Sequence, residues 1–187
     1  MDGTGGDQGV PYTFAKSTLP GDGNGVCAVC HTPHNATTEL PLWDHTAANG
    51  AAFTTYPEGG TIEGTITAPS GASALCLGCH DGTANLDAYG GATGALAMQA
   101  ADSYANFELD LSNDHPISVT YPANATDAGL QQMVDPAVLI AAGGYLYGAG
   151  NTVECASCHS MHQPAVISKL LRVTNDDSAL CLTCHVK

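Results

Sequence analysis

The sequence has very few positive charges. Four lysine and arginine residues stand against 18 aspartate and glutamate residues, which gives a formal net charge of −14. Nucleic acids and anionic membrane surfaces are therefore poor partners, because no basic patch is available to neutralise phosphate groups. The chain also lacks an uninterrupted apolar run of the roughly 18 residues that a membrane-spanning helix needs. We therefore expect no nucleic-acid partner and no membrane span.

The apolar material for a protein core is also scarce. Leucine, isoleucine, valine and phenylalanine together make up 34 of the 187 residues. Such a share, combined with a large net charge, is typical of chains that do not fold alone. With 22 glycines and 10 prolines, long helices and strands are not expected either. The chain is therefore either disordered or folded around something other than side chains.

The cysteines follow one strict pattern. All 8 of them fall into Cys-x-x-Cys pairs, and a histidine follows each pair directly. The pairs are Cys27/Cys30, Cys76/Cys79, Cys155/Cys158 and Cys181/Cys184, and the histidines that follow them are His31, His80, His159 and His185.

Zinc, disulfides and haem compete as explanations of this pattern. Structural zinc uses paired Cys-x-x-Cys ligands but gives no reason for a histidine after every pair. Disulfides within such pairs are redox-active, and the chain has no thioredoxin-like βαβ pattern. Covalent haem c uses both cysteines for thioether bonds and the adjacent histidine as an iron ligand. The sequence therefore predicts four haem c groups, whose porphyrins supply the missing core and without which the fold collapses.

The histidines that remain match the predicted irons in number. They are His34, His45, His115 and His162. One for each haem implies that every iron is held between two imidazoles, although a solvated surface histidine is the simpler interpretation of each one alone. Met98 and Met133 are rival ligands that would raise the reduction potential, whereas Met161 is expected to pack.

Geometry limits which haem each of these histidines can reach. Two axial ligands of one iron require Cα atoms at least roughly 10 Å apart, whereas residues three apart in a helical turn lie only about 5 Å apart. His34 therefore cannot serve the haem of His31, and His162 cannot serve that of His159. Each CHxxH segment would join two haems. Short-range pairing favours His34 or His162 for the second haem of its own unit, which leaves His45 and His115 for the others.

The motifs also form an internal repeat. "SALCLGCH" (73–80) and "SALCLTCH" (178–185) differ at a single position, and "CAVCHTPH" and "CASCHSMH" share the CHxxH form. We therefore predict a single domain over 1–187, with repeat units at roughly 24–90 and 150–187 and a connecting segment at 91–149.

The expected fold is mostly coil with few short helices and small β-hairpins. Hairpins are predicted over 53–67 and 145–154, because each segment contains a glycine-containing turn. Short helices are predicted within 94–109 and after the capping residues that begin at Asn175.

The haem segments resemble a known family. "CHTPHN" followed by "PLWDH", "NDHPI" and the closing "SALCLTCH" are similar to multihaem c-type cytochromes, and more narrowly to extracellular cytochrome nanowire subunits of the outer-membrane cytochrome E and S type. The resemblance covers well under half of the chain. It implies a core of stacked haems and a homopolymer in which one axial histidine crosses to the next subunit, with His34 as the candidate.

The expected function is electron transfer rather than catalysis. Irons held by two imidazoles have no open position for a substrate, and an anion-reducing multihaem enzyme would need cationic residues that are scarce here. Redox proteins or extracellular electron acceptors are the expected partners. Haem attachment is completed outside the cytoplasm, so we expect an extracellular or cell-surface location. A monomeric periplasmic tetrahaem shuttle is the alternative.

Overall fold

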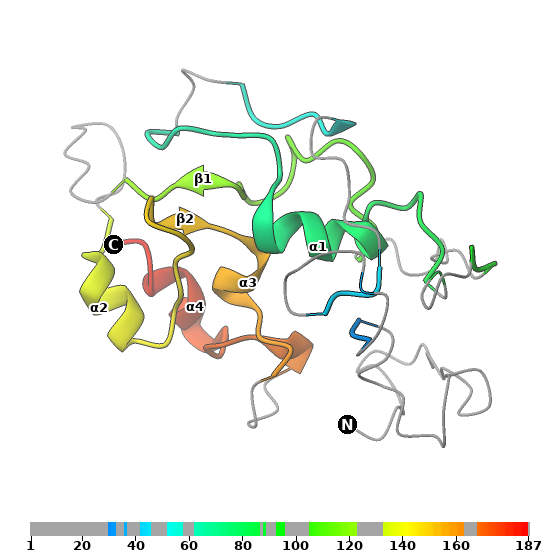
Figure 1. Cartoon of the computed structure of the whole chain (residues 1–187). Coiled ribbons are helices and arrows are strands. Elements are labelled where there is room, and N and C mark those ends of the chain that lie inside the picture. Colours follow the sequence, from blue (N-terminus) through cyan, green and yellow to red (C-terminus); the bar gives the residue numbers. More distant parts are fainter. Residues whose placement is uncertain are drawn as a thin grey trace. The chain divides into compact units, whose positions relative to one another are not determined.

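The fold is mostly coil with short helices and one small sheet, as the sequence predicts. The computed structural model describes residues 30–32, 36, 42–45, 52–57, 62–86, 88, 93–95, 105–122, 133–162 and 168–186. The helices are α1 (Gly71–His80), α2 (Pro136–Ala141), α3 (Cys155–Cys158) and α4 (Ala179–Leu182), with 3₁₀ turns η3 (Ser168–Leu170) and η4 (Asp176–Ser178), and the strands are β1 (Val119–Thr120) and β2 (Thr152–Val153) (Figure 1). No helix among these residues has the length and apolarity to cross a membrane.

The chain divides into two compact units. Unit 1 comprises Met1–Ala48 and Ala74–Leu109, and unit 2 comprises Asn49–Ser73 and Asp110–Lys187. The first two Cys-x-x-Cys-His motifs therefore belong to unit 1, and the last two belong to unit 2.

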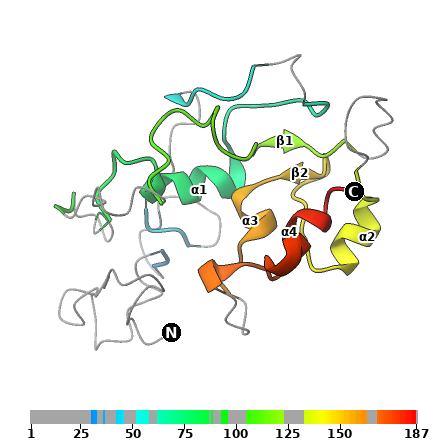
Figure 2. The same ribbon diagram turned by 180° about the vertical axis from the view of Figure 1, so that it is seen from behind.

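Unit 2 is built around the two-stranded sheet. β1 and β2 pair antiparallel, with Val119 opposite Val153, and Ile66 adds a further antiparallel bridge to Val119. The two views show β2 beside β1, and α2 beside α4 (Figures 1 and 2). The buried apolar cluster is small and consists of Tyr121, Leu139 and Leu146. So small a side-chain core agrees with the low apolar content of the sequence.

Local sequence explains how α2 and α1 are bounded. Asp135 caps α2 by accepting a hydrogen bond of 2.8 Å from the Ala137 N–H, and Pro136 occupies the first turn, where its missing N–H costs nothing. After α1, the Asp81 carboxylate accepts hydrogen bonds from the backbone of Thr83 and Ala84 at 2.8 and 3.1 Å. This local turn ends the helix directly after His80.

One predicted hairpin forms and the other does not. Tyr147 and Thr152 exchange backbone hydrogen bonds of 2.9 and 2.8 Å, which confirms the hairpin within 145–154. The prediction of a hairpin over 53–67 is wrong, because Thr54 pairs with Asp110 and Ile66 pairs with Val119. Both ends of this segment therefore use their backbone groups on distant parts of unit 2.

The helix predictions have mixed outcomes. The helix after Asn175 is confirmed by η4 and α4, but Ser178 makes no side-chain cap and adopts a left-handed backbone with φ 65°. The helix within 94–109 falls largely outside the described residues, and 105–109 are turn and coil.

Candidate functional site

The second motif is carried by the long helix α1. Cys76, Cys79 and His80 occupy its last five residues, and His80 ends it. The Nδ1 atom of His80 lies 2.7 Å from the Ala105 carbonyl oxygen. A carbonyl can only accept, so Nδ1 carries the proton and Nε2 keeps its lone pair. His80 is thus prepared as a metal ligand, in the manner in which backbone carbonyls orient metal-bound histidines.

The first motif meets the second in unit 1. Cys27 and His34 lie outside the described residues, whereas Cys30 and His31 are described. His31 forms an antiparallel bridge with Trp43, and their rings meet edge to face with centroids 5.7 Å apart. The same pairing brings in the buried His45, which is 2 % exposed and places its Nδ1 atom 3.7 Å from the Cys79 sulfur.

The thiols of the first two motifs lie in one electrostatic environment. The pKa of Cys79 is raised to about 12, first by burial and then by the neighbouring Cys30 and Asp81. Unit 1 therefore brings both attachment motifs together with His45, a histidine predicted as a distal ligand.

The third motif is anchored by a buried carboxylate that sequence reasoning missed. Glu154, directly before α3, is 5 % exposed. Its Oε2 atom accepts a short hydrogen bond from the Ser73 hydroxyl and one of 3.1 Å from the Ser118 hydroxyl. Ser73 also accepts a 3.1 Å bond from the Cys155 N–H, and Ser157 completes a capping box with Glu154. Four hydroxyl and backbone contacts thus fix the start of this motif.

A short antiparallel segment covers the other side of the third motif. The Ser160 N–H donates to the Leu170 carbonyl at 2.7 Å, and the Arg172 N–H donates to the Cys158 carbonyl at 2.8 Å. His159 then places Nδ1 2.9 Å from the Lys169 carbonyl oxygen, so it too keeps its Nε2 lone pair. His162 is exposed.

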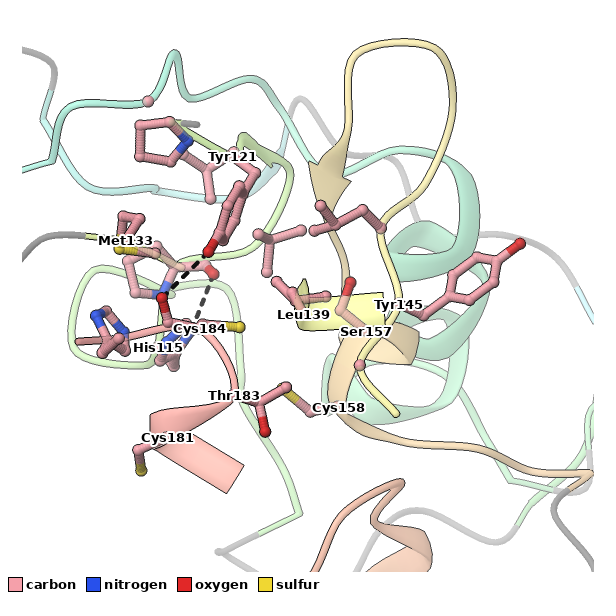
Figure 3. A pocket seen from close by; sticks show the side chains of 18 of the residues that line it. His115, Tyr121, Met133, Leu139, Tyr145, Ser157, Cys158, Cys181, Thr183 and Cys184 are labelled. Atoms are coloured by element: carbon pink, nitrogen blue, oxygen red, sulfur yellow. Dashed lines mark hydrogen bonds between the residues drawn. The ribbon is translucent and has the colours of Figure 1, made fainter. Parts of the chain in front are cut away.

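The fourth motif lines a cavity within unit 2. The cavity measures about 390 Å³, in the range of ligand and cofactor pockets. Cys181, Cys184 and His185 line it together with His115, and Cys158 of the third motif reaches it as well. Figure 3 shows His115, Met133 and Cys184 on one side of this cavity, with Leu139 and Ser157 facing them.

Tyr121 fixes the backbone of the fourth motif. Its side chain is 3 % exposed, and its hydroxyl lies 2.6 Å from the Val134 carbonyl oxygen and 3.1 Å from that of Cys184 (Figure 3). The Val134 N–H donates to the same Cys184 carbonyl at 2.8 Å. This arrangement holds Met133 opposite His185 in an antiparallel bridge.

The rings of His115 and His185 lie next to each other in the wall of the cavity. Their ring centroids are 6.5 Å apart, with the ring planes at 69°. Nδ1 of His115 lies 3.0 Å from the Pro116 carbonyl oxygen, which again leaves Nε2 with its lone pair. Metal–nitrogen bonds of about 2 Å and an imidazole radius of about 1 Å predict centroids about 6 Å apart across one metal ion. The observed centroid separation of 6.5 Å is close to this value.

The thiols of the third and fourth motifs also influence one another. The pKa of Cys184 is raised to about 11, first by burial and then by Cys158 and Cys181. The pKa of Cys158 is raised by burial, Cys155 and Cys181, while Arg172 opposes the shift. The two attachment motifs of unit 2 are therefore close neighbours.

The donor set fits covalent haem. Each described motif offers thiols beside a histidine, and three histidines have their Nδ1 atoms engaged by carbonyl groups. Met98 lies outside the described residues, and the exposed Met161 and the bridge partner Met133 are the described methionines of the predicted set. Of the supporting residues, Ser73 could have been noticed because it opens the repeated S-A-L-C-L-x-C-H segment. Tyr121 and Arg172 gave no comparable signal.

Comparison with protein families gives a match over the third and fourth motifs. Residues 149–187 match the protein family described as a doubled CXXCH motif. No curated protein matches the chain. The match supports a multihaem c-type cytochrome, in which the doubled motifs bind haem c covalently and transfer electrons.

Proposed function

We propose that this protein carries four haem c groups, each held between two imidazoles, and that it conducts electrons through them. The observation that carries the proposal is the neighbouring pair of rings, His115 and His185, beside Cys181 and Cys184. The cysteines tether the cofactor, and the two histidines bind iron from opposite sides. Bound haem supplies a one-electron change at iron without requiring a substrate site.

The assignment of His115 to His185 refines the expected pairing. Short-range pairing favours His162 for this haem, but the ring of His115 is the one that lies 6.5 Å from that of His185, centroid to centroid, and we assign His115 instead. Met133 is a poorer candidate because it is the bridge partner of His185. Directly opposite residues of an antiparallel pair project to the same side, whereas axial ligands approach iron from opposite sides. His162 then serves another haem.

The arrangement of the motifs favours electron transfer between neighbouring haems. In unit 2, Cys158 lines the same cavity as the cysteines of the fourth motif. In unit 1, Cys30 acts electrostatically on Cys79, and the buried His45 contacts Cys79. Each unit thus holds two attachment motifs close together, and we assign His45 to a haem of unit 1.

Intact-mass and optical measurements test this proposal. The expected mass exceeds that of the polypeptide by four haem groups, and the oxidised and reduced spectra are those of low-spin iron with two histidine ligands. A colourless protein that contains two zinc ions would overturn the proposal. Carbon monoxide binding to the native reduced protein would instead indicate an open iron and an enzyme that reduces small molecules.

We further propose that the protein assembles into an extracellular filament. Support comes from the resemblance of the haem segments to nanowire subunits, in which one histidine crosses between subunits, with His34 as the candidate here. The partners would be other copies of this chain, redox proteins and extracellular electron acceptors. Negative-stain or cryo-electron microscopy of purified material should show filaments, whereas discrete particles of the 19.0 kDa chain would favour a monomeric periplasmic shuttle.

A further inference from the structure

The few positive charges of this chain are unevenly placed. Of its four lysine and arginine residues, Lys16 and Lys187 lie outside the described residues. The two that lie within the described residues, Lys169 and Arg172, belong to one short segment. That segment is the one that pairs with the third Cys-x-x-Cys-His motif.

Arg172 is held against the motif by both its backbone and its side chain. Its N–H donates to the Cys158 carbonyl at 2.8 Å, and its Nε atom donates to the Ala156 carbonyl at 2.7 Å. Its guanidinium carbon lies 5.2 Å from the centre of the Tyr145 ring. A guanidinium group remains charged at every relevant pH and keeps its planar geometry. Arg172 thus fixes a permanent positive charge at the helix that bears Cys155 and Cys158.

Lys169 adds a second charge near the proximal histidine. Its carbonyl oxygen accepts the Nδ1 proton of His159 at 2.9 Å, and its own side chain is exposed. Exposure to solvent weakens its field. Arg172, which is half-buried, is therefore the stronger of the two charges.

Among the described residues, the charges nearest in sequence to the second and fourth motifs are acidic. Lys187 follows His185 by two residues but lies outside the described residues. Asp81 follows His80 directly and is buried, and Asp176 and Asp177 precede the fourth motif. The third motif has an acid of its own, Glu154, but hydroxyl groups satisfy that carboxylate at the start of α3. Among the described residues, the third motif therefore combines a carboxylate with two cations, whereas the charges beside the second and fourth motifs are carboxylates.

We propose that Arg172, assisted by Lys169, gives the haem site of the third motif the highest reduction potential in this chain. This site is formed by Cys155, Cys158 and His159. The inference rests on the proposed electron-transfer function. Reduction of ferric to ferrous iron adds one negative charge, so a nearby cation stabilises the reduced form. The hydrogen bond from His159 to Lys169 acts in the other direction by making the imidazole more basic. His80 makes the same kind of bond to Ala105 at 2.7 Å, so that bond does not distinguish the two sites.

Charge substitution at Arg172 tests the proposal in the haem-loaded protein. Optical redox titration of R172Q with one-electron mediators should move the highest-potential quarter of the signal downward. The expected change in the electron-exchange equilibrium with the other sites is about threefold to tenfold, where tenfold corresponds to about 59 mV. R172K keeps the charge and should move this component less. K16Q removes the same charge at a position well before the first motif and is the matched control.

A salt titration of the unmodified protein provides a second test that needs no variant. Added salt screens both signs of charge. The highest-potential component should therefore fall with salt, while components dominated by carboxylates rise. The inference is overturned if R172Q shifts the components no more than K16Q does, or if every component rises with salt. If the native protein shows no reversible haem titration, the proposed function itself fails.

Discussion

His115 and His185 come from distant parts of the chain, yet their imidazole rings lie with centroids 6.5 Å apart. Their segments meet because Tyr121 and Val134 both bond the Cys184 carbonyl, which fixes the end of the fourth motif in unit 2. Since each ring is a candidate ligand from the sequence alone, their proximity is the geometric observation on which the proposal of iron held by two histidines depends.

Replacing His115 with alanine should open one coordination position. We expect about a quarter of the haem to become high-spin and to bind carbon monoxide, because one of four predicted irons loses its distal imidazole. Visible and electron paramagnetic resonance spectra would measure this fraction. Asn113→Ala, an exposed change in the same loop, is the control and should leave all haem low-spin. An unchanged His115→Ala spectrum would show that His115 is not a ligand.

Acid should weaken the site of His185. Its pKa is lowered from 6.5, first by burial and second by the neighbouring His115. The folded chain then binds fewer protons than the unfolded chain, so the free energy of unfolding rises with pH. This contribution is complete above a pH of about 6.5 and is lost as the pH falls below that value. Iron binding to the neutral ring adds to stability in the same direction.

Urea denaturation followed by haem absorption would measure this dependence. The midpoint should fall between about pH 7 and pH 5.5, a window in which histidines titrate and most carboxylates do not. A midpoint that stays constant or rises on acidification would contradict the assignment.

The sequence predicts the haem motifs and the coil-rich fold because both depend on local information. Cysteine spacing is readable directly, and the hairpin within 145–154 needs only a turn between short strands. The prediction of a hairpin over 53–67 failed because Thr54 pairs with Asp110 and Ile66 pairs with Val119. No local sequence pattern reveals these distant partners. Strand pairing between residues far apart in the sequence is determined by tertiary contacts rather than by local β-propensity.

The repeated S-A-L-C-L-x-C-H segments also show how little local sequence decides, because two nearly identical segments can be compared within one chain. The first copy lies within one continuous helix, α1, whereas the second begins at the end of η4, continues through α4 and leaves the helix before its last cysteine. Ser73 in the first copy is buried and bonds Glu154, while Ser178 at the matching position has a left-handed backbone and no side-chain cap. Nearly identical local sequences thus fold differently because only one serine has a buried carboxylate to bind.

Phenylalanine in place of Tyr121 should destabilise unit 2. The change removes the hydroxyl that bonds the Val134 and Cys184 carbonyls in a buried position. Leaving buried carbonyls with fewer partners costs about 1–3 kcal/mol. Chemical denaturation would measure this loss. Tyr145→Phe is the matched control, since Tyr145 is 47 % exposed and should change stability by less than about 0.5 kcal/mol. Equal effects of the two substitutions would show that the Tyr121 hydroxyl has no special role.

Alanine in place of Glu154 should have a larger effect, because this carboxylate joins three segments of unit 2. The Ser73 and Ser118 hydroxyls both donate to it, and its loss leaves these buried groups without their acceptor. We expect about 2–4 kcal/mol of destabilisation, because each unsatisfied buried group costs about 1–3 kcal/mol. Chemical denaturation of the haem-loaded protein would measure the loss.

Two further variants locate this effect of Glu154. Glu154→Gln keeps one acceptor oxygen and should recover part of the stability, while the exposed Glu108→Gln should change little. Because Ser73 also accepts the Cys155 N–H, the Glu154→Ala variant should additionally lose order at the third motif. Hydrogen exchange at residues 155–159 would then rise more than exchange in α2. A uniform rise across both segments would instead mean that Glu154 supports the whole of unit 2 and not this motif in particular.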